Sequence, residues 1–276
     1  NLSLAAPAIS GILIRPGETF SLWRLVGKTS ARRGFREGLM IKGGKPDRFV
    51  NQYEYLQLVV DPITANIGPN IKPGEIMTVR NLLYCMLVVS ANEACNILAE
   101  AVSGSVSAFV AEMNQKAQSL GCDNTHFVNA NGLHDDNHYT TAYDMALMFM
   151  AAMEHDLFLE IIATPSYTTA PTNISKERYF FNTNGLISNL YYAGYVYDKC
   201  IGGKTGSTDE AGRCLVSAAE DGDKQMISVI MGSGPIEIDG KTRQGQFTES
   251  KKLLEYGFNN FRRVTLSRPD EPVDKL

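Results

Sequence analysis

The sequence lacks several features that mark common classes of protein. No run of its 276 residues approaches the roughly 20 uninterrupted apolar residues of a membrane span, and the first residues lack the charged-then-apolar layout of a signal peptide. Dense Lys/Arg runs are also absent, and the formal net charge is −4. We therefore expect no membrane span and no nucleic-acid partner, and we interpret the basic cluster at 30–38 as a solvated face. An exported protein would have to be a processed or truncated form.

Cysteine is scarce and follows no metal-binding spacing. The five cysteines are Cys85, Cys95, Cys122, Cys200 and Cys214. They match no zinc pattern and leave one thiol over under any disulfide scheme. We therefore predict no metal and no cofactor. The cysteines do not indicate whether the protein works in a reducing or an oxidising compartment. Cys200 and Cys214 flank a glycine-rich stretch and could face one another.

The remaining composition is that of a globular chain, 44% hydrophobic and 20% charged, long enough for one large core or two smaller ones. Helical patterns are clearest between 78 and 155, and a closing helix is predicted at 248–261. Three polar residues stand where helix caps are expected: Thr78, Ser105 and Thr141. Thr141 and Asp144 also have the spacing of a capping box. The region 155–200 has a looser pattern, with turn signals at 164–173 and 182–189.

The glycine-rich stretch CIGGKTGSTDEAG, at 200–212, raises the question of phosphate binding. A Walker A loop needs an earlier glycine at fixed spacing and a helix after its Gly-Lys-Thr. Asp198 occupies the glycine position, and 211–220 has the alternating, β-branched character of a strand. The sequence therefore predicts Lys204 on or beside the edge of an antiparallel hairpin. Such glycines can also mark no more than a bulge or a close backbone approach.

Two short motifs lie far apart in the chain, Ser90-Ala91-Asn92 and Lys204-Thr205-Gly206. Together with the stretches PGEIMTVRNLLYCMLVVSANEACNILAE, HFVNANGLHDDNHYTTAYDMA and GGKTGSTDEAGRCLVSAA, they closely resemble the serine-type D-alanyl-D-alanine carboxypeptidases, the low-molecular-weight penicillin-binding proteins. The resemblance covers about residues 58–262. It implies an α+β fold of the penicillin-binding-protein/β-lactamase-like transpeptidase type, with helices beside an antiparallel sheet.

This resemblance implies catalytic roles for the two motifs. Ser90 and Asn92 would pass protons and hold the substrate amide, and Lys204 would be a cation at the mouth of an acyl-transfer site. A serine hydroxyl needs a nearby base, and a lysine serves as one only when its pKa is depressed. A plainer alternative is that Ser90 and Asn92 merely cap the helix that follows them.

The same resemblance implies substrate-binding roles along the predicted strand. Thr205 would help to hold the terminal carboxylate of a D-alanyl-D-alanine peptide, and Gly206 would leave room for that peptide to lie beside the strand. The backbone amide of Ser207 would supply half of an oxyanion hole.

The family's third motif, SxxK, which carries the nucleophilic serine and its lysine, is absent upstream of Ser90. Ser21 and Ser30 come nearest, but each has arginine where lysine is required, and arginine stays protonated and cannot act as a general base. We therefore expect a fold without its first strands and nucleophile helix, with an unpaired sheet edge. We also expect little or no carboxypeptidase turnover.

The beginning of the chain resembles a different family. ISGILIRPGETFSLWRLVGKTSARRGFREGLMIKGGK looks like part of the VanW-like proteins of Gram-positive bacteria. The join is a gene fusion, a recombined pseudogene or an assembly error, and the sequence does not choose between them. The predicted organisation is a VanW-like fragment, a junction, an incomplete carboxypeptidase-like domain and the start of a further segment: 1–46, 47–57, 58–262 and 263–276.

Two classes of function follow from these resemblances. One is a serine-type D-Ala-D-Ala carboxypeptidase acting on peptidoglycan stem peptides. The other is a catalytically incomplete protein that binds the same peptides. The implied partner in both cases is a stem peptide ending in D-Ala-D-Ala, with β-lactams as further candidate ligands. The implied location is the cell envelope or the exterior of a bacterium, of Gram-positive type.

Overall fold

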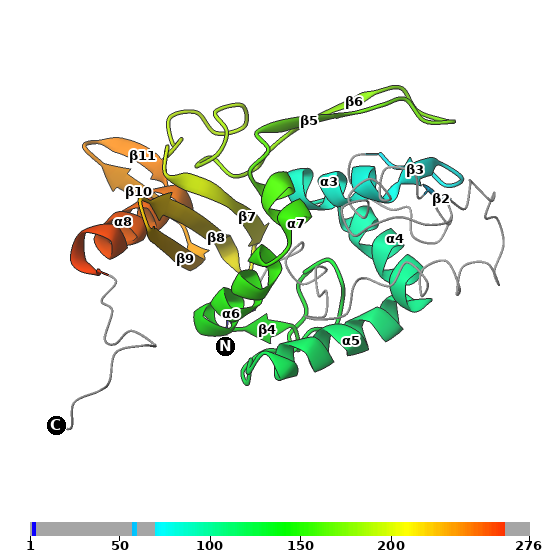
Figure 1. Ribbon diagram of the computed structural model, residues 1–276, viewed down its shortest axis with the longest axis horizontal. Helices are drawn as coiled ribbons and strands as arrows, with labels where there is room; N and C mark the ends of the chain where they lie inside the picture. Colours follow the sequence, from blue (N-terminus) through cyan, green and yellow to red (C-terminus); the bar gives the residue numbers. More distant parts are fainter. Residues whose placement is uncertain (1, 4–56, 60–69, 263–276) are drawn as a thin grey trace, which may run out of the picture.

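The structure is a computed structural model that describes residues 2–3, 57–59 and 70–262. The chain folds as helices beside antiparallel β-structure, which confirms the predicted α+β class (Figure 1). The predicted segment 1–46, except for Leu2–Ser3, lies outside the described residues, as do the junction at 47–56 and the predicted C-terminal segment at 263–276.

The helices expected within 78–155 and near 248–261 are present, and a further helix lies in the region 155–200. They are α3 (Val79–Val89), α4 (Asn92–Ser103), α5 (Val106–Ser119), α6 (Ala142–Met153), α7 (Asp156–Ile162) and α8 (Gly245–Asn260). The side chains of the three predicted caps each accept a backbone N–H of the first turn: Thr78, Ser105 and Thr141. Among the described residues no single helix is long and apolar enough to cross a membrane, although α4 and α5 reach that length and composition together as a pair bent by 85°.

Only half of the predicted capping box is present at the start of α6. Thr141 accepts the N–H of Asp144, but the Asp144 carboxylate accepts from the Asn124 N–H at 2.9 Å and from the Thr125 hydroxyl at 2.7 Å. The carboxylate therefore ties the loop before β4 to α6. The side chain took the longer-range partners because Asp144 is buried beneath that loop.

In the described part of the chain the main sheet has three antiparallel strands in the order β7-β8-β9: β7 (Cys200–Thr208), β8 (Gly212–Asp221) and β9 (Lys224–Ser233). Lys204 therefore lies on an edge strand, as predicted, and a strand rather than a helix follows it. This arrangement excludes a phosphate loop. Within the described ranges β9 also has no strand on its far side, in agreement with the expected unpaired edge.

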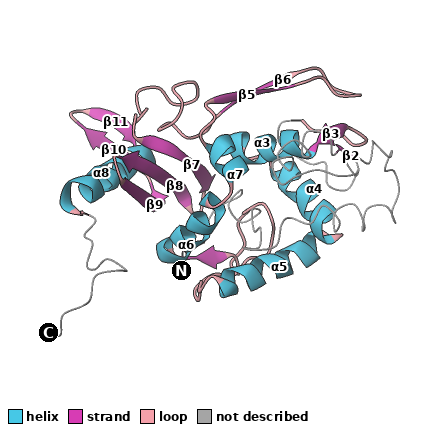
Figure 2. Ribbon diagram, viewed as in Figure 1, coloured by secondary structure: helices cyan, strands magenta, loops and turns pink. Residues whose placement is uncertain are grey.

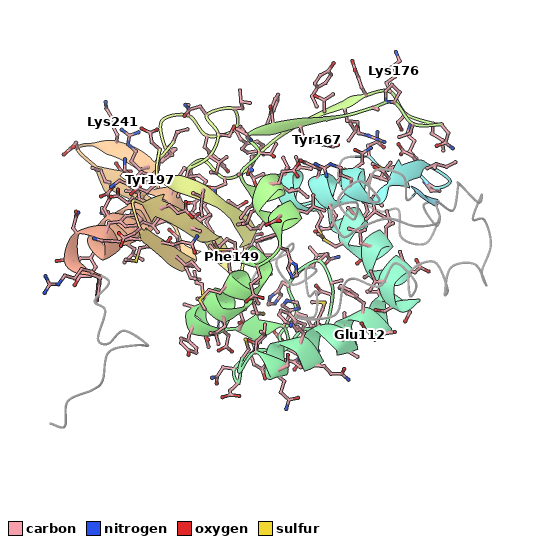
Figure 3. The ribbon with its side chains drawn as sticks, in the orientation of Figure 1. Glu112, Phe149, Tyr167, Lys176, Tyr197 and Lys241 are labelled. Carbon is pink, nitrogen blue, oxygen red and sulfur yellow. The ribbon has the colours of Figure 1, made fainter. Side chains whose placement is uncertain are left out.

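Both faces of this sheet are covered. Cys214, Val216 and Ala218 of β8 join the core formed with α3 to α7, whereas Leu215 and Ala219 point to the other face and pack with α8. This alternation follows from the period of two of a β-strand. Phe149 of α6 is fully buried in the helical layer and meets Phe158 of α7 edge to face (Figure 3).

The described residues also form four two-stranded pairs. They join β1 (Leu2–Ser3) with β4 (Tyr139–Thr140), β2 (Gln57–Val59) with β3 (Ile76–Thr78), β5 (Ser166–Thr169) with β6 (Arg178–Phe181), and β10 (Pro235–Ile238) with β11 (Lys241–Gln244). Of these, β5–β6 and β10–β11 are seen most clearly in Figure 2. The looser region 155–200 thus contains α7 and the β5–β6 hairpin, neither of which was predicted. A seven-residue helix and a largely exposed hairpin leave too short a periodic signal to be predicted.

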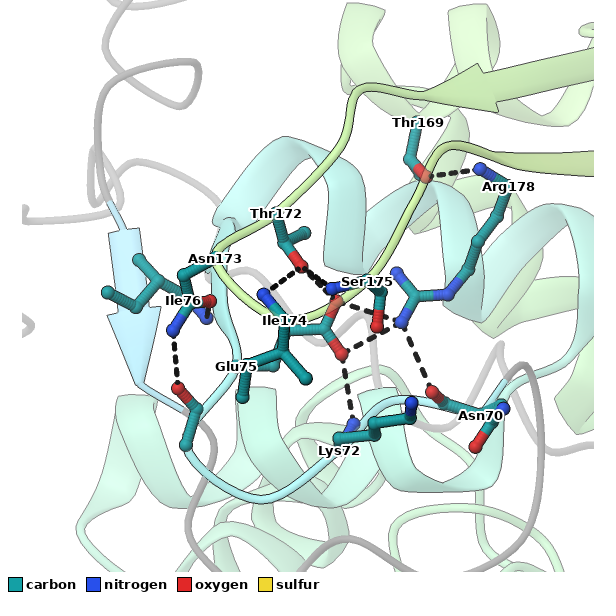
Figure 4. Close-up of polar contacts among 11 residues, drawn as sticks. Asn70, Lys72, Glu75, Ile76, Thr169, Thr172, Asn173, Ile174, Ser175 and Arg178 are labelled. Carbon is teal, nitrogen blue, oxygen red and sulfur yellow. Dashed lines mark hydrogen bonds and ion pairs between the residues drawn. The ribbon is translucent and has the colours of Figure 1, made fainter.

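The β5–β6 hairpin docks on the turn before β3 through a buried ion pair at the start of β6 (Figure 4). Arg178 Nη2 lies 2.8 Å from each carboxylate oxygen of Glu75, which is fully buried. Burial alone would raise the pKa of Glu75, but hydrogen bonds from Thr172, from the Lys72 N–H and from Arg178 outweigh it and lower that pKa. This network holds the hairpin against the start of α3.

No disulfide joins any of the five cysteines, all of which lie in the described part of the chain. The suggestion that Cys200 and Cys214 face one another is wrong. In the antiparallel register Cys200 is opposite Ala219 and Cys214 is opposite Gly206, so the two thiols lie at opposite ends of the β7–β8 hairpin. The tight turn between the strands sets this register, and flanking positions in sequence are therefore not cross-strand neighbours.

Candidate active site

Ser90 lies in the short connection between α3 and α4. Its backbone is left-handed, with φ 59° and ψ 43°, and its N–H donates to the Cys85 carbonyl. A left-handed conformation costs a non-glycine residue roughly 1–2 kcal/mol, so glycine would be the ordinary residue at this helix end. Serine here instead places a hydroxyl at the junction, and strained backbone of this kind is common at functional positions.

Lys204 reaches this hydroxyl from the edge strand β7. Its Nζ is hydrogen-bonded to Ser90 Oγ and donates to the Thr205 carbonyl at 2.7 Å. The two motifs, 114 residues apart in the sequence, therefore meet within hydrogen-bond reach.

The environment of Lys204 favours its neutral form. The residue is only 3% exposed, and no carboxylate in the described part of the chain forms an ion pair with it. Burial lowers the pKa of Lys204 to about 8, and the nearby Cys95 thiol slightly opposes that shift. Burial raises the pKa of Cys95 itself to about 12, so this thiol stays uncharged. Lys204 is therefore poised to exchange a proton near neutral pH.

Ser90 and Asn92 do not cap α4, so the plainer alternative is wrong. The N-cap residue is Ala91, which makes no side-chain capping bond, and Asn92 is the first residue of the helix and half-buried. The Ser90 hydroxyl is engaged with Lys204 instead.

Thr205 has a partner that the sequence did not reveal. Its Oγ1 lies 2.6 Å from Thr183 Oγ1, and the Thr183 N–H donates to the Val88 carbonyl at 3.2 Å. Thr183 thus bridges the end of α3 and the edge strand. No motif marks it, because it stands in the segment 182–189, which shows turn signals.

The remaining predicted residues continue along β7. Gly206 is half-buried and Ser207 is exposed, opposite Cys214 and Arg213 respectively. Gly203, one position before Lys204, has no room for a side chain, since a Cβ there would lie 2.4 Å from the Val216 carbonyl oxygen of β8. Among the described residues no group of three or more His, Cys, Asp or Glu could hold a metal ion.

Comparison with known proteins shows the family of this chain. The family model of the D-alanyl-D-alanine carboxypeptidases matches residues 66–234. The chain belongs to the D-alanyl-D-alanine carboxypeptidase family. A second model, that of the VanW-like proteins, matches residues 1–51, in agreement with the resemblance of the N-terminal stretch.

Named relatives of this carboxypeptidase-family chain come from several bacteria. It is 35% identical over 207 residues to D-alanyl-D-alanine carboxypeptidase DacF of Bacillus subtilis, which covers 75% of this chain and 49% of the relative. It is 38% identical over 197 residues to DacA of Escherichia coli, which covers 70% of this chain and 44% of the relative. The chain therefore spans about half the length of the curated relatives it matches.

Solved structures support the predicted fold. A D-alanyl-D-alanine carboxypeptidase of Mycobacterium tuberculosis aligns with a TM-score of 0.66 at 26% identity, covering 100% of this chain and 86% of that one. The Streptomyces K15 DD-transpeptidase aligns with a TM-score of 0.66 at 23% identity, covering 94% of this chain and 88% of that one. The penicillin-binding type of fold is thus confirmed. Ser21 and Ser30, the nearest approaches to the SxxK motif, lie outside the described residues.

Proposed function

We propose that this member of the carboxypeptidase family binds the acyl-D-alanyl-D-alanine end of a peptidoglycan stem peptide along the outer edge of β7. The observation that carries this proposal is the contact between Ser90 and Lys204 beside that edge. In the described part of the chain β7 pairs only with β8, so an extended peptide can add there as a further strand.

Charge and hydrogen bonding assign an orientation to the peptide. The Thr205 hydroxyl, beside Lys204, suits the terminal carboxylate, since hydrogen bonds to charged groups are worth about 1.5–3 kcal/mol. The hydrogen bond between Thr205 and Thr183 orients the Thr205 hydroxyl in advance. Asn92 would hold the substrate amide, and the amide of Ser207 would face the carbonyl oxygen.

Slow turnover accompanies this binding in our proposal. The sequence has no SxxK motif before Ser90, so the usual serine and its lysine are missing. We expect D-alanine release well below the roughly 1–10³ per second of ordinary enzymes. A protein whose main activity is to bind stem peptides is the second candidate, favoured by the same absence. Because peptidoglycan lies outside the cytoplasmic membrane, either function places the site in the cell envelope or outside the cell, and the VanW-like resemblance favours a Gram-positive bacterium.

Calorimetry with an N-acetylated peptide ending in D-Ala-D-Ala tests the binding. We expect measurable affinity for this peptide and a loss for the L-Ala-L-Ala peptide and for the C-terminal amide. Thr205→Val should weaken binding about 10-fold, the worth of one hydrogen bond to a carboxylate. Thr242→Val, at an exposed position of β11, is the matched control. Equal affinity for the acid and the amide would contradict the proposed orientation.

A further inference from the structure

The contact between Lys204 and Ser90 has the chemistry of a base and a nucleophile. A protonated lysine has three donor hydrogens and no acceptor, whereas a neutral amine keeps two hydrogens and one lone pair. Lys204 Nζ has two partners among the described residues, the Thr205 carbonyl and Ser90 Oγ. Nζ donates to both oxygens, and once Lys204 is neutral, one N–H keeps the bond to Thr205 while the lone pair accepts the hydroxyl proton of Ser90.

We propose that Ser90 is the acylated nucleophile of this chain and that Lys204 is its general base, so that the SxN serine and the KTG lysine together replace the absent SxxK pair. This inference rests on the proposed function, because it uses the same site and the same peptide. It assigns Ser90 a covalent role in addition to the proton transfer expected from the family resemblance.

Three observations on the described residues support this assignment. Lys204 is buried without an ionic partner, the condition under which a lysine acts as a base. Ser90 is only half-buried, so a substrate carbonyl can approach its hydroxyl. Its left-handed backbone places the hydroxyl at the connection between α3 and α4.

Other hydroxyls near Lys204 fit the role less well. Ser207 is three residues away on the same strand, so its side chain points to the opposite face. Thr205 is the immediate neighbour, with its hydroxyl bonded to Thr183. Of the described residues, Ser90 is the hydroxyl in direct contact with Nζ.

The reaction balances without a metal or a cofactor. Ser90 Oγ bonds to the carbonyl carbon of the penultimate D-alanine while Lys204 Nζ takes the hydroxyl proton. The C–N bond then breaks, and Lys204 returns the proton to the leaving amine of the terminal D-alanine. Water hydrolyses the ester. With a penicillin, the same steps open the lactam, and because the leaving nitrogen stays attached, the adduct has the full mass of the drug.

The site is built for slow acylation. An oxyanion hole ordinarily includes the amide of the nucleophile, but the Ser90 N–H donates to the Cys85 carbonyl. Loss of one oxyanion donor costs about 10²–10³ in rate. The acyl-enzyme should therefore form over long incubation rather than in rapid turnover.

Intact-mass analysis after prolonged incubation with a fluorescent penicillin, followed by peptide mapping, tests the inference. We expect one adduct of the full drug mass, located on Ser90, and its absence from Ser90→Gly and Ser90→Ala. Glycine suits the left-handed backbone, so Ser90→Gly keeps the fold. Ser107→Ala, at an exposed position of α5, is the matched control and should label like the original chain.

Lys204→Arg separates a base from a mere cation. Arginine keeps the positive charge for a carboxylate but cannot take a proton, so labelling should fall by about 10²–10⁴-fold, the usual contribution of a general base. The labelling rate of the unaltered chain should rise with pH around a midpoint of about 8, the lowered pKa of Lys204. Among the described residues, Cys95 of α4 is the titratable group that acts on Lys204, and its thiol titrates far above that range. Glu93, on the same helix, acts on Cys95.

Each outcome decides between the proposals. An adduct on another residue, or full labelling of Lys204→Arg, overturns the inference. No adduct after prolonged incubation, with the D-Ala-D-Ala peptide still bound in calorimetry, also overturns it and leaves the proposed function standing. Absence of both the adduct and peptide binding overturns both.

Discussion

The close approach of β7 and β8 at Gly203 allows a substitution whose cost can be worked out in advance. A Cβ at this position would lie 2.4 Å from the Val216 carbonyl oxygen, 2.6 Å from Ser217 Oγ and 2.9 Å from Asn184 Nδ2. The first of these atoms belongs to the backbone of β8 and cannot move without opening the ladder that carries Lys204. Overpacking of this kind costs about 1–3 kcal/mol, and a backbone clash belongs to the upper part of that range.

We therefore expect Gly203→Ala to lower the free energy of unfolding by about 3 kcal/mol and the Tm by about 6–12 °C for a domain of this size. Urea denaturation followed by circular dichroism measures the change. Because the register next to Lys204 is disturbed, peptide binding should weaken as well.

The matched control is Gly234→Ala. A Cβ at Gly234 meets no heavy atom within 4 Å, so its effect should stay within about 0.5 kcal/mol. If Gly203→Ala were as stable as Gly234→Ala, the packing argument for the β7–β8 contact would be refuted.

Three further predictions concern single side chains. Ser90→Gly should be more stable than Ser90→Ala by about 1 kcal/mol in urea denaturation, because both lose the hydroxyl but only alanine keeps the left-handed strain; equal stability would contradict that strain. Thr183→Val should weaken peptide binding in calorimetry by about 3- to 10-fold, since Thr205 loses its orienting partner; unchanged affinity would argue against this role. Glu75→Gln should cost about 3–5 kcal/mol by leaving Arg178 buried without its carboxylate. Because the pKa of Glu75 is lowered in the folded protein, its contribution to the free energy of unfolding is present at neutral pH and is lost as the pH falls below the ordinary carboxyl range. The free energy of unfolding of Glu75→Gln should therefore decrease less on acidification than that of the original chain.

Features that depend on local chemistry were predictable from the sequence. The caps at Thr78, Ser105 and Thr141 and the hairpin after Lys204 appear where their patterns placed them, since a cap or an alternating strand needs only neighbouring residues. The pairing of the motif at Ser90 with that at Lys204 was expected through the family resemblance, which carries information on tertiary structure that periodicity lacks.

Features that depend on distant partners were not predictable. The α7 helix and the β5–β6 hairpin carry too few periodic residues, and Asp144 took partners in another loop instead of the box partner at Thr141. The separation of Cys200 from Cys214 follows from the register of the strands.

The amino-acid sequence alone determined the family, the α+β class and the edge position of Lys204, because motifs and strand patterns are written in consecutive residues. Only the tertiary structure decided that Lys204 is buried without an ionic partner in the described part of the chain, that it contacts Ser90 and that Thr183 stands against Thr205. Burial and cross-chain contact arise when separate elements pack, and the same packing lowers the pKa of Lys204 toward the range in which a lysine can act as a base.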